Sequence, residues 1–323
     1  MTKQTRTNTP KRKKYAFQGL LLLLLLVGFL CSPLVFFVRS LLVMGVYSGI
    51  HKKSSAVLQE HIDLHIPGGL GTAAADWYPF SMVFVADAAY ARYTGEQDAK
   101  LTIFYNFPAF SYAKGCSRLF DPDSLYYNGF YGAYILQDSS NRSLAQGQLD
   151  ENVAASVARF DFFYLVLGDF GLSAADEVFD FAVRERTEGV KYAGHDGWTR
   201  LELDITVNGS AHNARKGVTS YLQYGHPNFG AVAEEFAPVN ISGRIYARYF
   251  PEADASVYFY VMGQEEACQR CDDDILSQSR LRIKKPRDDM REASDCQQSP
   301  LIPSGGQSFP QGKRFIIASN SAP

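Results

Sequence analysis

Residues 198–208, WTRLELDITVN, carry the clearest strand signal in the chain. Apolar side chains at odd positions 201–207 alternate with polar side chains at even positions 200–206. A repeat of two residues with one polar face is typical of an antiparallel strand that buries one side. Asn208-Gly209 follows directly and is a residue pair preferred in tight hairpin turns. The stretch therefore predicts a half-buried strand that ends in a β-hairpin.

Strand signals of the same kind recur through the middle of the chain. These segments are rich in Val, Ile, Tyr and Phe and are separated by Gly, Pro, Asn and Asp. The other expected strands are Ser81–Ala86, Leu101–Phe107, Gly132–Gln137, Val178–Arg184, Ser220–Tyr224, Ile241–Phe250 and Ala255–Met262. Helix signals are fewer and occur at Asp150–Arg159 and Glu265–Ser279. We expect a mainly β, β-rich α+β fold, built as an antiparallel sandwich or barrel.

The composition supports a folded core and limits the kinds of partner. Hydrophobic residues make up 46% of the chain and aromatic residues 14%. The net charge is −2, and removing the six cations of the N-terminal tail leaves about −8 for the rest. A polyanion such as nucleic acid would be repelled, so we expect no nucleic-acid partner.

The N-terminus has the composition of a membrane anchor. Residues 1–15 carry six basic side chains and no acid, whereas residues 16–38 carry no charge and include seven consecutive leucines. An uncharged helix of that length measures roughly 34 Å, enough to cross the ~30 Å hydrocarbon layer. We expect a basic cytoplasmic tail at 1–15 and a transmembrane helix at 16–38, with an extension to about residue 48 as an alternative boundary. A cleaved signal peptide is the rival interpretation, although its apolar region is normally about 7 to 15 residues long.

The remaining segments follow from the anchor. Basic residues stay on the cytoplasmic side, so the rest of a single-pass cell-membrane protein is expected to be extracytoplasmic. Residues 49–76 resemble a stalk or linker, and residues 77–279 hold the β-rich domain. Residues 280–323 are rich in Ser, Gln, Pro and charge, which predicts a disordered tail.

Four cysteines lie beyond the anchor. Cys268 and Cys271 have the two-residue spacing of thioredoxin-type redox pairs, but three aspartates follow them and oppose thiolate formation. Together with Cys116 and Cys296 they offer three alternatives. These are structural disulfides or unpaired thiols, a redox pair, and a four-cysteine zinc site.

One loop stands out as a candidate binding segment. Asp121 and Asp123 lie two residues apart, and Asn128 follows, so their oxygens could bind calcium. The same residues also suit an ordinary turn, because Asp caps turns and Pro122 fixes φ. The aromatic residues Tyr126 and Tyr127 add flat surfaces with polar edges, which suit sugars, peptides or lipid tails.

The sequence lacks the motifs of several common classes of enzyme and nucleotide-binding protein. It contains no nucleophile elbow, no phosphate-binding loop and no dinucleotide fingerprint. We therefore expect no catalytic residues, no cofactor and no metal, and a non-catalytic extracytoplasmic binding or interaction domain. The bilayer is the expected partner of 16–38, and an envelope polymer, a peptide or a lipid is the expected ligand. The alternatives are an anchored envelope hydrolase that uses Asp121 and Asp123, or a redox protein.

Overall fold

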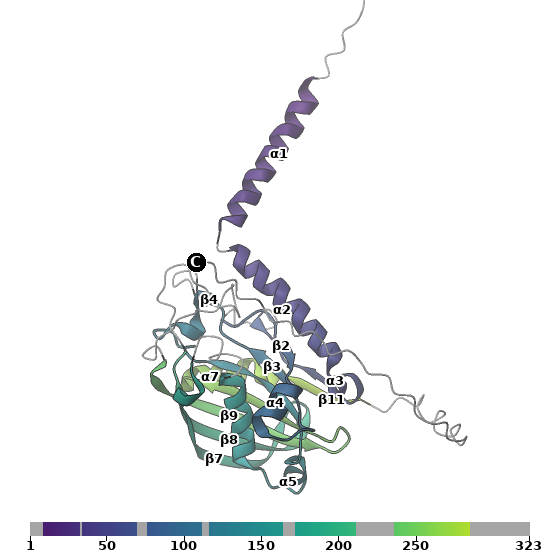
Figure 1. Ribbon diagram of the computed structural model, residues 1–323, viewed down its shortest axis with the longest axis vertical. Helices are drawn as coiled ribbons and strands as arrows, with labels where there is room; N and C mark the ends of the chain where they lie inside the picture. Colours follow the sequence, from purple (N-terminus) through teal and green to yellow (C-terminus); the bar gives the residue numbers. More distant parts are fainter. Residues whose placement is uncertain are drawn as a thin grey trace, which may run out of the picture. The chain divides into compact units, whose positions relative to one another are not determined.

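A computed structural model describes residues 9–32, 34–69, 76–111, 116–163, 172–210 and 236–284 (Figure 1). The α-helices are α1 (Thr9–Leu30), α2 (Leu34–Ser54), α3 (Ala56–Glu60), α4 (Asp87–Thr94), α5 (Asn141–Ala145), α6 (Glu151–Phe160) and α7 (Glu265–Asp274). The longer strands are β3 (Lys100–Asn106), β6 (Phe130–Gln137), β7 (Phe179–Tyr192), β8 (His195–Asn208), β9 (Pro238–Phe250) and β10 (Ala255–Gly263). The shorter strands are β1 (Ile62–His65), β2 (Met82–Val85), β4 (Phe110–Ser111), β5 (Cys116–Ser117) and β11 (Arg280–Ile283).

One large antiparallel sheet organises the chain. Its seven strands run in the order β2-β3-β6-β10-β9-β8-β7. Two small sheets, β1-β11 and β4-β5, accompany it. The β-rich α+β class is therefore confirmed. In the described ranges, helices rather than a second large sheet cover the faces of this one, so the expected sandwich or barrel does not appear there.

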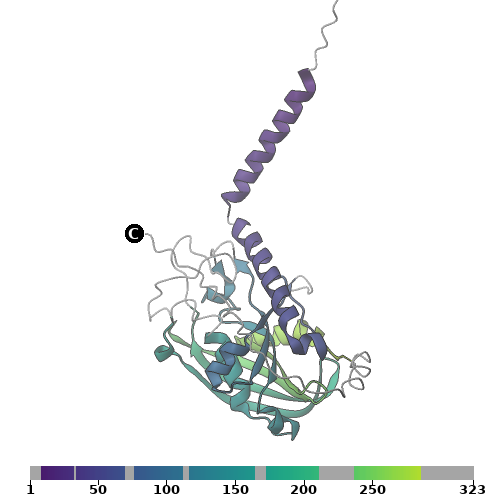
Figure 2. The same ribbon diagram turned by 45° about the vertical axis from the view of Figure 1, so that its right-hand side comes forward.

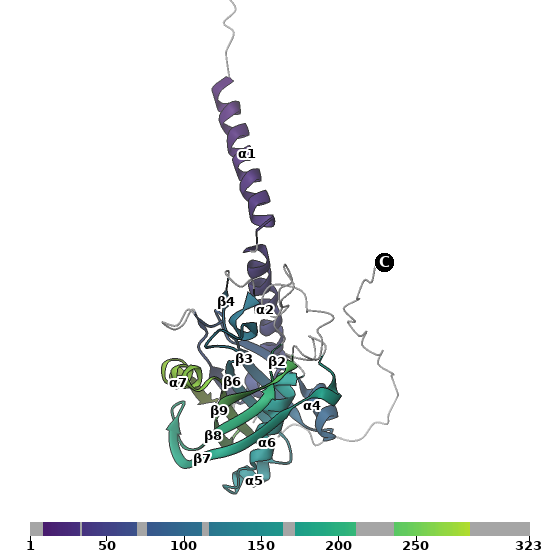
Figure 3. The same ribbon diagram turned by 90° about the vertical axis from the view of Figure 1, so that its left-hand side faces the viewer.

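The sheet separates two hydrophobic cores. One core includes α6 and Tyr90 of α4 and packs against side chains such as Leu203 and Tyr260. The other includes α7, β1 and β11 and contains Trp198 and Phe259. Figure 3 shows α6 and α4 on one side of the sheet and α7 on the other. Strands in the middle of the sheet, such as β10, are buried along their whole length for this reason.

Residues 198–208 lie in β8. Their alternation places the side chains of Leu201, Leu203, Ile205 and Val207 in the core. The expected hairpin after Asn208 does not form, since β9 begins only at Pro238 and Asn208 itself is buried. The hairpin lies at the other end of β8 instead. Tyr192 of β7 pairs with His195 of β8 across a two-residue turn at 193–194. The expected strand Ser220–Tyr224 lies outside the described residues.

Residues expected to form a stalk and a tail contribute to the fold. Ile62 and Leu64 of β1 are almost completely buried. Strand β1 pairs with β11, so that Leu64 lies opposite Leu281. The alternating pattern of β1 is only four residues long, too short to distinguish from a polar linker. Part of 49–76 thus belongs to the domain, as do residues 280–284 from the start of the expected tail.

The N-terminal apolar residues are divided between α1 and α2, with a break around Cys31 and Ser32. Pro33 follows the break, and proline removes a helical hydrogen bond and clashes with the preceding turn. Among the described residues, no helix meets both the length and the apolarity needed to span a bilayer.

Candidate functional site

A groove lined by both polar and apolar side chains crosses β7, β8 and β9 and is bordered by the first turn of α7. Asp180 of β7 pairs with Thr206 of β8, which pairs with Asn240 of β9. In the next row Asp204 pairs with Ser242. The strand repeat of two residues points the intervening side chains into the core, so these polar groups share the outer face. The groove has a volume of about 680 Å³, within the range of small-ligand sites.

Negative charge dominates this groove. Asp180, Asp204 and Glu265 line it, and no lysine or arginine does so within the part of the chain that the structure describes. Arg184 stands beside it, with ion pairs to Glu265 at 3.1 Å, Glu202 at 3.0 Å and Asp204 at 3.5 Å. Hydrogen bonds from Ser242 and then Arg184 lower the pKa of Glu265, which keeps this carboxylate ionised. Arg244 also pairs with Glu265 at 3.3 Å. Three carboxylates line the groove and these two arginines reach it from its border, which leaves the local charge negative.

A buried carboxyl lies on the other face of the sheet. Asp161 follows α6 and is completely buried, and its Oδ2 accepts hydrogen bonds from Tyr260 at 3.0 Å and Tyr134 at 3.3 Å. Its Oδ1 and the hydroxyl of Tyr105 have no hydrogen-bond partner among the residues that the structure describes. Burial raises the pKa of Asp161 to about 7. Gly132 helps to make room for this cluster, since a Cβ there would lie 3.0 Å from the Tyr260 hydroxyl.

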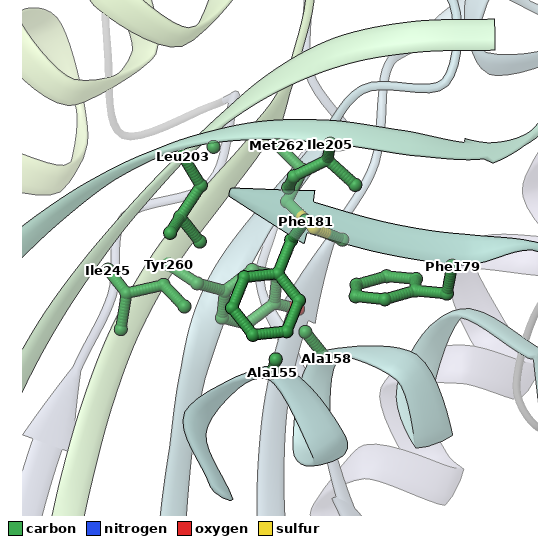
Figure 4. Close-up of a pocket in the computed structure, with 10 residues that line it drawn as sticks. Ala155, Ala158, Phe179, Phe181, Leu203, Ile205, Ile245, Tyr260 and Met262 are labelled. Carbon is green, nitrogen blue, oxygen red and sulfur yellow. The ribbon is translucent and has the colours of Figure 1, made fainter. Parts of the chain in front are cut away.

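An apolar cavity adjoins this cluster between α6 and the sheet (Figure 4). Its volume is about 10 Å³, room for one water molecule at most. Tyr260 lines the cavity and also donates to Asp161, whereas Phe181, Ala155 and Ile245 supply apolar walls. The space is therefore a small packing gap and not a substrate pocket.

The predicted binding loop has a structural role. The Oδ1 of Asp121 accepts from the backbone N–H of Asp123, and Ser124 N–H bonds to the carbonyl of Asp121, which is a turn. Tyr126 donates to Asp76 at 2.8 Å, and Tyr127 donates to the carbonyl of Ser210 at 3.3 Å. The two tyrosines thus join different neighbours instead of forming one ligand surface with the aspartates.

Asn128 of the same loop is buried against the end of β8. It adopts a left-handed conformation with φ of 56°. Its Nδ2 donates to the carbonyl of Asn208 at 3.1 Å, and its Oδ1 accepts from the N–H of Ser210 at 2.6 Å. The side chain of Asn208 in turn accepts from Val178 N–H at 2.6 Å and donates to the carbonyls of Asp176 and Phe236.

We expect Asn208→Ala to lower the free energy of unfolding by about 3 kcal/mol. The substitution leaves buried main-chain groups without the hydrogen bonds that the asparagine side chain provides. Asn240→Ala is the matched control, since its exposed side chain makes a single hydrogen bond with Thr206. It should cost at most about 0.5 kcal/mol. Urea unfolding of both variants provides the measurement, and equal losses would refute a special role for Asn208.

The cysteines of α7 are unsuited to redox chemistry. Cys268 and Cys271 are free and fully buried. Burial raises the pKa of both thiols well above the ordinary value, which disfavours the reactive thiolate. Cys268 donates to the carbonyl of Ser242 at 3.3 Å. The side chain of Cys116 and all of Cys296 lie outside the described residues. Nowhere in the described ranges do three His, Cys, Asp or Glu side chains come together as a metal site.

Sequence reasoning missed the residues of the groove and of the buried cluster. The alternation in 198–208 places Asp204 and Thr206 on one polar face, so these two residues of the groove were detectable. The bordering strands and α7 could not be assigned to that face without the strand order. Asp161 carries no signal in the sequence, because a single aspartate after a helical segment does not show whether its carboxyl is buried. No family model, curated protein or solved structure matches this chain.

Proposed function

We propose that the protein is a membrane-anchored, extracytoplasmic binding protein whose groove over β7, β8 and β9 holds a polar ligand with positive charge. The negative groove carries this proposal. Its carboxylates would pair with ammonium or guanidinium groups, and the hydroxyl and amide groups of Thr206, Ser242 and Asn240 would bond to a peptide backbone or a polymer. A lysine- or arginine-containing peptide is the ligand class that fits this chemistry.

Addition of a peptide strand to the edge of the sheet is a less suitable mode of binding. Strand β7 is the edge, and its pairing with β8 is irregular after Val183 and after Thr187. Charged side chains such as Arg184 and Glu188 also line it. Bulges and charges on an edge strand oppose pairing with another chain. Side-chain contacts in the groove therefore account better for recognition.

A catalytic role for Asp161 is the second candidate function. A carboxyl with a pKa near neutrality suits general acid–base chemistry. However, the space that Tyr260 lines beside it is a gap of only about 10 Å³. Substrate would need a rearrangement of α6 to reach the carboxyl. Binding remains the better proposal for this reason.

The anchor is part of the proposal. The apolar residues from Tyr15 to Leu30 in α1 form a helical stretch of roughly 24 Å. Lysines can snorkel and the bilayer can thin locally, which would make up the difference from ~30 Å. The basic tail would hold the N-terminus in the cytoplasm, leaving the domain outside.

Titration with pentalysine, followed by calorimetry at low ionic strength, tests the groove. The double variant Asp180→Asn/Asp204→Asn is expected to weaken binding about tenfold, since each lost surface charge pair contributes roughly 0.7 kcal/mol. Asp98→Asn is the matched control, because Asp98 is exposed and lies in the loop before β3, outside the groove. Affinity that is unchanged in the double variant, or reduced equally in the control, would refute the proposed site.

A further inference from the structure

Helix α2 has one face that belongs to the domain. Met44 is buried against the sheet. The Oγ of Ser48 accepts from Val83 N–H at 2.7 Å, and the Nδ1 of His51 accepts from Val85 N–H at 2.9 Å. Strand β2 is the edge of the sheet, so its outward N–H groups lack a partner strand. Side chains of α2 take that partner's place, which fixes the helix to the sheet. The ribbon views show α2 lying beside the β2 edge (Figure 1, Figure 2).

The other face of α2 is apolar and exposed. Leu42, Val46 and Ile50 repeat at intervals of four residues and have exposed fractions of 65%, 65% and 59%. Val43 and Tyr47 lie beside them at the same spacing and are also exposed. Large contiguous apolar surfaces are rare on soluble monomers and mark contact with a partner or a membrane. We call these five residues the α2 stripe.

We propose that the α2 stripe lies in the surface of the bilayer that α1 crosses, so that the domain is held against the membrane in one orientation. This inference rests on the proposed anchor. The break around Cys31 and Ser32 lets the chain change direction where it leaves the membrane. Leu42, the first residue of the stripe, follows this break by only about three helical turns, so the stripe stays close to the point of exit.

Charge favours lipid over a second copy of the chain as the occupant. Lys52 and Lys53 follow the stripe at the end of α2, and Arg39 precedes it. No acidic residue occurs in the sequence of α2. An apolar stripe with flanking basic residues is the pattern of helices that lie at the interface of anionic membranes. In a dimer packed through α2, the basic residues of both copies would be brought into one assembly, and α2 has no acidic residue to pair with them.

Quenching by brominated lipids tests the orientation. Full-length Tyr47→Trp protein is reconstituted into phosphatidylcholine–phosphatidylglycerol vesicles with brominated acyl chains. Burial of the stripe at the acyl boundary predicts that roughly half of the emission added by this substitution is lost. Tyr93→Trp is the matched control, because Tyr93 is 45% exposed on α4 and should be quenched little. Wild-type protein supplies the background from Trp77 and Trp198, which are both buried.

The outcomes separate the inference from the anchor. If carbonate leaves the protein in the vesicles but the two variants are quenched equally, the α2 stripe does not lie in the bilayer and the anchor stands. If carbonate extracts the protein, the anchor itself fails. A third outcome is weak quenching of Trp at position 47 by brominated lipid together with protection of the same residue from the aqueous quencher acrylamide. This result would assign the α2 stripe to contact with a second copy and overturn the inference.

Discussion

Asp161→Asn is expected to make the protein more stable than the wild type above neutral pH and to leave it almost unchanged in mild acid. Burial raises the pKa of Asp161 from 3.8 to about 7. Between these values the folded state holds a proton that the unfolded state has released. The wild type therefore loses stability as the pH rises from about 4 through 7. At 1.36 kcal/mol for each pKa unit, the loss amounts to roughly 4 kcal/mol.

Asparagine keeps a neutral acceptor for Tyr134 and Tyr260 but does not titrate. Denaturant unfolding at pH 4 and pH 8 should show similar stabilities at pH 4 and an advantage of about 4 kcal/mol for the variant at pH 8. Asp180→Asn, which removes an exposed carboxyl, controls for the change in net charge. If wild type and Asp161→Asn show parallel pH profiles, the buried carboxyl does not hold its proton as proposed.

Local patterns in the sequence account for most of the strands. The period-two pattern of 198–208 survives in β8, and the expected segment Ile241–Phe250 lies within β9. Strand β8 alternates between core and groove over 201–207, so its own sequence shows which face is buried. Strand β9 is buried on both faces over 243–247, so its sequence shows a strand but not which face meets the groove. The predicted hairpin at Asn208 does not form, because the tertiary contacts of Asn208 outweigh its preference for a tight turn. Asn208 uses its side chain to tie three main-chain segments together, a role that asparagine in a turn does not reveal.

Long-range pairing accounts for what the sequence did not reveal. Strand β1 pairs with β11 across more than 200 positions of the chain, and neither segment has enough residues to show a period on its own. The choice between one sheet and a sandwich likewise depends on which strands are neighbours. The candidate groove has the same origin, since Asp180 and Asn240 become neighbours of Thr206 only through strand order. Residue type alone pointed to Asp121 and Cys268 as candidate site residues. In the structure Asp121 accepts a hydrogen bond within its own turn, and Cys268 donates to the carbonyl of Ser242.

Arg244→Met is expected to lower the free energy of unfolding by about 3 to 5 kcal/mol, because it leaves the buried Asp272 carboxylate without its cation. Arg244 lies in β9 and is only 5% exposed. It pairs with Asp272 and Glu265 of α7, each at 3.3 Å. Asp272 is also buried, and it accepts a hydrogen bond from Tyr246 at 2.7 Å. This network joins α7 to the sheet at the border of the groove.

Arg270→Met is the matched control on the same helix. Arg270 pairs with Glu266, but both side chains are more than half exposed, so solvent screens the pair. We expect it to cost no more than about 0.5 kcal/mol. The double variant Arg244→Met/Asp272→Asn should recover part of the loss, because the second change removes the buried charge left behind. Urea unfolding measures all three variants. Equal losses for the Arg244 and Arg270 variants would show that α7 is held by its apolar contacts alone.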